Sequence, residues 1–259
     1  MVFDQTMPTF STPAILLRRS SYGDFDLIVT LLTLEKGKLT VIAKNAKKSR
    51  KRFSGVLELF SLLHLVCTAA RGRGMPVLQE ATIEHPFSDI RGNIMKTAYA
   101  SYWAELITLW LEEGKTQARF YHLLQFCLHA LDAGLFDEKT LSIIFQIRFL
   151  NISGLSPNFS RCSKCRMDTD KIASNRLVFE LAKGGILCQG CASNSVSRLS
   201  ISKKIIKQLL WIQENDLKTV RRLKFNQTDL NEGLKLLEAF VMYHLGREPK
   251  SLKFLDSVR

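Results

Sequence analysis

Long apolar runs are missing from this sequence. Glu112 and Glu113 end the longest apolar helical candidate, so no segment reaches the roughly 20 residues that span a bilayer. The first residues also lack the basic stretch, apolar stretch and small-residue cleavage site of a secretory signal. We therefore expect no membrane partner, a cytoplasmic location and reduced cysteines.

The motifs of common catalytic sites are missing as well. A nucleotide-binding P-loop needs Gly-x-x-x-x-Gly-Lys-Ser/Thr, but Gly37-Lys38 lacks the first glycine and the final hydroxyl, and Lys139-Thr140 lacks both glycines. There is no Gly-x-Ser-x-Gly, no His-Glu-x-x-His and no His-x-Glu combined with cysteines. No cluster of carboxylates favours a metal-dependent nuclease. The sequence predicts a binding protein, not an enzyme, with no small-molecule substrate.

Acidic residues are too few to balance the basic ones. The 259 residues include 37 Lys and Arg against 24 Asp and Glu, a net charge of +13. The excess is uneven, because residues 1–85 carry a net +5, residues 86–160 a net −1, and residues 161–225 a net +9. Solubility alone would not need such blocks. Clustered positive charge indicates a polyanionic partner, most often nucleic acid.

Four of the cysteines form two matched pairs, Cys162 with Cys165 and Cys188 with Cys191, and 22 residues lie between the pairs. Each Cys-x-x-Cys is a tight turn that directs two thiolates at one centre, and two such turns complete a tetrahedral zinc site. Separate disulfides, buried thiols or a redox pair are the alternatives. Two matched pairs without a secretion signal favour zinc. Four thiolate ligands leave no open position, so the metal should be structural.

The segment between the cysteine pairs has the features of a zinc ribbon. Residues 177–181 (LVFEL) are strand-like, and Gly184-Gly185 supplies a turn before the second pair. We expect the ribbon to occupy residues 160–195 approximately, inserted in a helical domain.

The N-terminal segment contains short apolar runs separated by turn residues. Five such runs are strand candidates, at residues 14–19, 27–34, 39–43, 57–67 and 77–83. Five strands within residues 1–85 predict a small closed barrel of the OB type. An SH3-like barrel and an open meander are the structural alternatives.

Between the third and fourth strand candidates lies a strongly basic loop. Six of residues 44–52 are basic, and we expect each to contact a phosphate: Lys44, Lys47, Lys48, Arg50, Lys51 and Arg52. A flexible loop of this kind would bind backbone without reading bases. Arg71 and Arg73, before the last strand, are further DNA-binding candidates that could lie on the same side. The alternative is a solvated charge run or a localisation patch.

Helical periodicity replaces the strand pattern from Ser88 onward, with Ser88 as the expected N-cap. Further helices are expected at about residues 117–131, 138–152, 202–211 and 227–245. The helix near residue 202 has a basic face, and residues 221–224 add a second basic cluster. The predicted fold is therefore α+β and multidomain, with an OB barrel at residues 1–85 and a helical domain with the inserted zinc ribbon at residues 86–259.

The order of several short motifs resembles the RecO family of bacterial DNA repair proteins. Residues 22–29 (YGDFDLIV), 35–38 (EKGK) and 43–48 (AKNAKK) are similar to its N-terminal barrel, and residues 102–106 (YWAEL), 154–157 (GLSP) and 252–255 (LKFL) to its helical domain. The cysteine pairs match the zinc-bearing members. Asn45 stands where the family usually has glycine, and Asp24 where it usually has glutamate.

The resemblance implies a mediator of recombination and DNA repair. Such a protein binds single- and double-stranded DNA, anneals complementary strands and, with RecR, helps load RecA onto DNA coated by single-strand-binding protein. It also implies that the helical domain binds the C-terminal tail of single-strand-binding protein and that the protein is nucleoid-associated in a bacterial cytoplasm. A zinc-ribbon transcription or translation factor that binds RNA through the same basic surfaces is the alternative.

Overall fold

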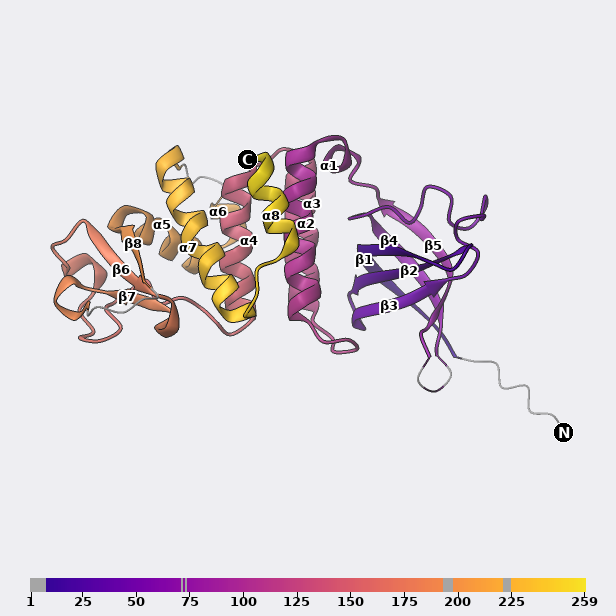
Figure 1. Ribbon diagram of the computed structural model, residues 1–259, viewed down its shortest axis with the longest axis horizontal. Coiled ribbons are helices and arrows are strands. Elements are labelled where there is room, and N and C mark those ends of the chain that lie inside the picture. The colour runs from indigo at the N-terminus through magenta and orange to yellow at the C-terminus, as the bar shows by residue number, and fades with distance from the viewer. Residues whose placement is uncertain (1–7, 71, 73, 193–197, 221–224) are drawn as a thin grey trace. The chain divides into compact units, whose positions relative to one another are not determined.

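The computed structural model describes residues 8–70, 72, 74–192, 198–220 and 225–259 (Figure 1). The chain divides into two compact units. Met1–Ala133 and Lys250–Arg259 form the first unit, and Gly134–Pro249 forms the second. No helix of the described residues is both long and apolar enough to cross a membrane.

The first unit begins with a closed barrel. Its strands are β1 (Thr9–Tyr22), β2 (Asp26–Thr33), β3 (Gly37–Ala43), β4 (Leu62–Thr68) and β5 (Val77–His85), in the order β1-β2-β3-β5-β4 (Figure 1). Neighbouring strands are antiparallel except β3 and β5, which pair in parallel at Ile42 and Val77. This order closes the sheet on itself, so the OB-type barrel is confirmed and an open meander is excluded.

Inward-facing residues of the strands fill the barrel, because alternate side chains of a strand point to the same face. Val29 and Leu31 of β2 are fully buried, as are Val41 and Ala43 of β3. The predicted strand at 57–67 begins only at Leu62, so its first residues were assigned wrongly. Phe60 has a positive φ of 70°, outside the β region that a regular strand uses.

The helices of the first unit, over its described residues, are α1 (Ser88–Gly92), α2 (Ile94–Trp110), α3 (Ala118–Asp132) and α8 (Lys250–Val258) (Figure 1). The prediction that Ser88 caps the long helix is wrong. Ser88 is the first residue of the short α1, and Asn93 is the N-cap of α2. The Asn93 Oδ1 atom accepts hydrogen bonds from the backbone N–H groups of Met95 at 2.9 Å and Lys96 at 3.1 Å, which would otherwise lack partners.

A glycine at the start of β3 allows the barrel to contact the loop between α2 and α3. Gly37 has a φ of +66°, and a Cβ built on it would lie 1.8 Å from the backbone oxygen of Lys115. The neighbouring Lys38 accepts a hydrogen bond on its backbone oxygen from the N–H of Gly114 at 3.1 Å, and its Nζ donates to the Thr108 oxygen at 2.9 Å. Only glycine leaves room for the Lys115 backbone at this distance.

The second unit contains α4 (Glu138–Ile152), α5 (Lys203–Glu214), α6 (Leu217–Val220) and α7 (Gln227–Leu245). Gly233 of α7 permits a close crossing, because a Cβ there would lie 3.2 Å from the side chains of Ile143 on α4 and Ile205 on α5. Along the sequence, these helices lie before and after a ribbon. This confirms the predicted α+β fold class, a barrel followed by helices with an inserted ribbon.

The ribbon lies between α4 and α5 along the chain. Its three-stranded sheet has the order β7-β6-β8, with β6 at Arg176–Glu180, β7 at Gly185–Leu187 and β8 at Arg198–Ser202. In the described part of the ribbon, short 3-10 turns accompany the strands at Thr169–Lys171, Leu181–Lys183 and Gln189–Cys191. The predicted strand at 177–181 corresponds to β6, and Gly184, with a φ of +60°, makes the predicted turn.

Candidate metal centre and nucleic-acid interface

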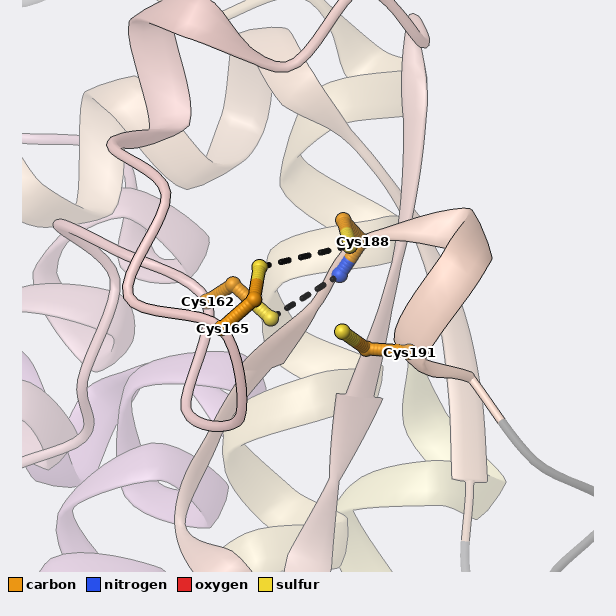
Figure 2. A group of neighbouring side chains, drawn as sticks. All are labelled: Cys162, Cys165, Cys188 and Cys191. Atoms are coloured by element: carbon orange, nitrogen blue, oxygen red, sulfur yellow. Dashed lines mark hydrogen bonds between the residues drawn. The ribbon is translucent and has the colours of Figure 1, made fainter.

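The four predicted cysteine ligands come together at one end of the ribbon. Figure 2 shows the side chains of Cys162, Cys165, Cys188 and Cys191 directed at a common centre, and their sulfur atoms all lie within 4.8 Å of one another. The Cys165 and Cys188 sulfurs are 3.8 Å apart. Four tetrahedral bonds of about 2.3 Å from a metal to sulfur would place the sulfurs about 3.8 Å apart.

The first cysteine pair lies on a tight hairpin turn. The Cys162 N–H donates to the Met167 oxygen at 2.8 Å, and the Arg166 N–H donates to the Cys162 oxygen at 3.0 Å. Arg166 has a φ of 64°, in the left-handed region that glycine usually occupies. This turn brings the Cys165 side chain round to the same side as Cys162.

The second pair lies on the 3-10 turn Gln189–Cys191, closed by a hydrogen bond of 3.0 Å from the Cys191 N–H to the Cys188 oxygen. The two turns are held together through β7. The Ser163 N–H donates to the Ile186 oxygen at 2.8 Å, and Gly185 lies so close that a Cβ on it would be 2.3 Å from the Ser163 hydroxyl. Gly185 is therefore needed for its small size.

The chemistry of the cysteines fits a metal site better than a disulfide. All four thiols are free, and the 3.8 Å between Cys165 and Cys188 is far beyond the roughly 2.05 Å of an S–S bond. Burial raises the pKa of Cys162, but backbone N–H groups of Cys165, Cys188 and Lys164 outweigh this and lower its pKa to about 6. Contacts with the Cys188 thiol, together with desolvation, raise the pKa of Cys191 to about 12. Four thiolates at this spacing need a cation between them, so the cluster could hold a metal ion.

The six cations of the predicted DNA-binding loop all lie at the surface. These are Lys44, Lys47, Lys48, Arg50, Lys51 and Arg52, and each is exposed. None of them forms an ion pair with any residue that the structure describes. Their charges are therefore available to an anionic partner.

The loop is attached to the barrel at several points. Ala46, Phe53 and Leu57 belong to the core of the barrel, and Phe53 is only 4% exposed. The Lys47 N–H donates to the Phe25 oxygen at 2.9 Å, and the Arg52 N–H donates to the Ser49 hydroxyl at 3.0 Å. The apolar side chains of the loop pack into the barrel core, and its basic side chains are exposed to solvent. The loop therefore presents its positive charges on the outside of the barrel.

The turn between β1 and β2 contacts this loop and carries two exposed aromatic side chains. The Lys47 ammonium donates to the Gly23 oxygen at 2.9 Å, and the Lys48 Nζ lies 3.4 Å from the centroid of the Phe25 ring. Phe25 is 40% exposed and Tyr22 is 52% exposed. The sequence alone did not identify Tyr22 and Phe25 as candidates, because a pattern of strands does not show that the β1–β2 turn contacts the basic loop. An aromatic residue in a hairpin turn, where no core needs it, is the available signal.

The remaining basic residues of the N-terminal segment and of residues 161–225 differ from these six. Arg71 and Arg73 lie outside the described residues, as do Arg221, Arg222 and Lys224. Several cations of residues 161–225 are already in ion pairs, among them Arg176 with Glu232 at 2.7 Å and Lys204 with Asp229 at 2.6 Å.

The turn that bears Cys162 and Cys165 carries cations that are not in such ion pairs. Arg161, Lys164 and Arg166 are exposed and form no ion pair with a residue in the described ranges. The free positive charge of the second unit thus includes the turn that bears Cys162 and Cys165.

Comparison with known proteins places the chain in a family. The model described as "Recombination protein O N terminal" matches residues 7–87, and the model described as "Recombination protein O C terminal" matches residues 91–253. The first match covers the barrel with the basic loop, and the second covers the cysteine cluster.

Three relatives match along nearly their whole length, and each is named DNA repair protein RecO. The protein from Desulfosudis oleivorans is 45% identical over 98% of this chain and 99% of its own. The protein from Desulfatibacillum aliphaticivorans is 42% identical over 98% of both chains, and that from Syntrophus aciditrophicus is 34% identical, also over 98% of both. The chain belongs to the RecO family of DNA repair proteins.

Proposed function

We propose that this protein is a non-enzymatic recombination mediator. It binds single- and double-stranded DNA, anneals complementary strands and, with RecR, helps load RecA onto DNA coated by single-strand-binding protein. The observation that carries the proposal is the set of six exposed cations on the anchored loop 44–52, none in an ion pair with a described residue. Membership of the family supports the repair role. Nucleoid association in the cytoplasm follows from DNA binding.

The basic loop contacts DNA through its phosphates. Lys and Arg side chains neutralise phosphates of any sequence and release counterions, so binding weakens steeply as salt rises. Two complementary strands held at their backbones keep their bases free to pair. A surface that grips phosphates without covering both strands therefore assists annealing.

The C-terminal tail of single-strand-binding protein, which is acidic and apolar, binds the second unit. Residues 161–225 carry the largest positive excess of the chain, and Arg161, Lys164 and Arg166 are exposed there. Charge-assisted contacts between these cations and the tail would bring the mediator to coated DNA.

The metal of the cysteine cluster is zinc, in a structural role. Cys162, Cys165, Cys188 and Cys191 supply four thiolates, the donor set typical of structural zinc, and leave no open position for water. The ion holds the two turns of the ribbon together when bound, and the chemistry of the protein requires nothing further from it.

The test is an annealing assay with complementary DNA strands coated by single-strand-binding protein. The intact protein should accelerate pairing well beyond a generic polycation of equal charge. A variant with alanine at all six basic positions of the loop should lose most of this acceleration. Acceleration equal to the polycation's would instead favour the zinc-ribbon RNA-binding factor.

Partner binding is tested separately. Co-precipitation with RecR and with the tail of single-strand-binding protein, with and without zinc chelation, should retain both partners when the metal is bound. Arg161→Glu with Lys164→Glu should weaken capture of the tail. Capture unchanged by both reversals would reject this assignment of the tail.

A further inference from the structure

The β1–β2 turn contacts the basic loop and carries two aromatic residues. Tyr22 ends β1 and pairs with Asp26 at the start of β2, so Gly23, Asp24 and Phe25 form a short turn. Gly23 has a φ of +55°, which allows the sharp reversal. The rings of Tyr22 and Phe25 are thereby displayed at the end of the hairpin, 52% and 40% exposed.

Three contacts fix this turn to the basic loop. The Asn45 N–H donates to the Asp26 Oδ1 at 2.7 Å, the Lys47 N–H to the Phe25 oxygen at 2.9 Å, and the Lys47 Nζ to the Gly23 oxygen at 2.9 Å. Lys48 also covers part of the Phe25 ring, with its Nζ 3.4 Å from the centroid. These contacts place the Phe25 ring beside the cations of the loop, and Tyr22 lies at the other end of the same turn.

Exposed rings beside cations suit one class of ligand. Proteins that bind single strands combine a positive groove for the backbone with aromatic side chains on which unpaired bases stack. In a duplex the base faces are already stacked on each other and are out of reach. Burial in the barrel is the alternative role for an aromatic residue here, and the exposure of both rings excludes it.

We infer that Tyr22 and Phe25 stack on unpaired bases of a DNA strand whose phosphates lie on the loop of residues 44–52. The site then holds single strands by charge and by stacking, and duplexes by charge alone. This inference rests on the proposed function, since it assumes that the basic loop contacts the backbone. It adds a preference for single strands and unpaired ends.

The experiment compares two single strands of equal length and charge, one of thymidines and one of abasic sites. Fluorescence anisotropy gives the affinity of the full chain for each strand and for a duplex. The wild type should bind the thymidine strand more tightly than the abasic one. Tyr22→Ala and Phe25→Ala should each weaken thymidine binding by about 5- to 150-fold, the range for loss of one stacked base, and leave abasic and duplex binding unchanged.

Matched variants separate stacking from damage to the fold. Tyr22→Phe and Phe25→Tyr keep a ring and should retain wild-type affinity. Tyr243→Ala removes a tyrosine of α7 that is 46% exposed, and it should change no affinity. Thermal unfolding checks that each variant is folded.

Three results would overturn the inference: equal wild-type affinity for the thymidine and abasic strands, equal weakening of both strands by the alanine variants, or no weakening of either. None of these concerns the proposed function, which fails if alanine at the six basic positions leaves the affinity for every strand unchanged. The two failures are therefore distinguishable.

Discussion

Glu105, within α2, holds the start of α8 through Ser251. Its Oε2 atom accepts the Ser251 N–H at 2.7 Å, and its Oε1 atom accepts the N–H of the preceding Lys250 at 3.1 Å. The Ser251 hydroxyl also donates to this carboxylate. The contact joins residues separated by more than half the chain and satisfies N–H groups at a helix start, where a negative charge is favoured.

Replacing Glu105 should loosen α8. Glu105→Gln removes the charge and one acceptor, so we expect the free energy of unfolding to fall by about 1–2 kcal/mol, as for the loss of a helix cap. Urea unfolding measures the change. Glu214→Gln, an exposed glutamate at the end of α5, is the control and should alter stability by less than about 0.5 kcal/mol. Equal stability of the two variants would show that the Glu105 contacts add nothing.

Gly37 should not tolerate alanine. Its φ of +66° strains any L-residue, and the added Cβ would lie 1.8 Å from the Lys115 oxygen. Gly134 has a φ of +61° with open space around it, so Gly134→Ala reports the backbone strain alone, about 1 kcal/mol. We expect thermal unfolding to show a clearly larger loss for Gly37→Ala. Similar losses for both variants would mean that the loop at Lys115 moves away freely.

Regular periodicity and spaced cysteines made much of this structure predictable. The expected helices at about 117–131, 138–152 and 227–245 agree with α3, α4 and α7 to within a residue or so. α3 and α7 each have an apolar face of helical period, whereas α4 is apolar and buried on nearly every side, and its start is marked by the Asp137 cap. The clustering of the four cysteines was equally predictable, since two Cys-x-x-Cys turns constrain their own geometry.

The remaining features depend on contacts that no local pattern records. Ala46, Phe53 and Leu57 have no strand or helix period, so their role in closing the barrel is visible only after the strands are placed. The start of α2 depends on the Asn93 cap, a better partner for orphan N–H groups than the expected Ser88. The aromatic part of the candidate interface was missed for the same reason, because it exists only where two loops meet.

The basic loop should determine how binding responds to salt. Arg50→Ala with Lys51→Ala removes two exposed cations. If each contacts a phosphate, the slope of log affinity against log salt for a single strand should fall in magnitude by about 1.4. Anisotropy titrations between low and moderate salt measure it. Lys235→Ala with Arg247→Ala removes the same charge from exposed positions in and after α7, and should leave the slope unchanged. A matching fall in both would indicate a response to net charge alone.

Acidification should destabilise the fold partly through His244. Burial lowers the pKa of His244 below its ordinary value of 6.5, and its Nε2 has no hydrogen-bond partner in the described part of the chain. The unfolded chain therefore takes up the proton first, and stability falls as the pH drops below about 6.5. We expect His244→Gln to lose less stability than the wild type between pH 7.5 and 5.5 in urea unfolding. His122→Gln, at an exposed site on α3, is the control. An unchanged pH dependence in His244→Gln would refute this.

Metal binding can be tested with the exposed ligand Cys165. An exposed cysteine replaced by serine ordinarily changes stability by less than about 0.5 kcal/mol. If Cys165 binds a structural metal, Cys165→Ser should instead cost several kcal/mol, lowering the midpoint of thermal unfolding by roughly 5 °C or more, and should reduce the bound zinc measured by mass spectrometry.

Chelation provides the control for this substitution. Once a chelator has stripped the metal from both proteins, the serine variant and the wild type should unfold at nearly the same temperature, because the lost interaction no longer exists in either. A difference that persists after chelation would assign the Cys165 effect to packing or hydrogen bonding of its sulfur. A wild type whose unfolding temperature ignores chelation would show that the ribbon stands without a metal, held by the Ser163–Ile186 hydrogen bond and its sheet alone.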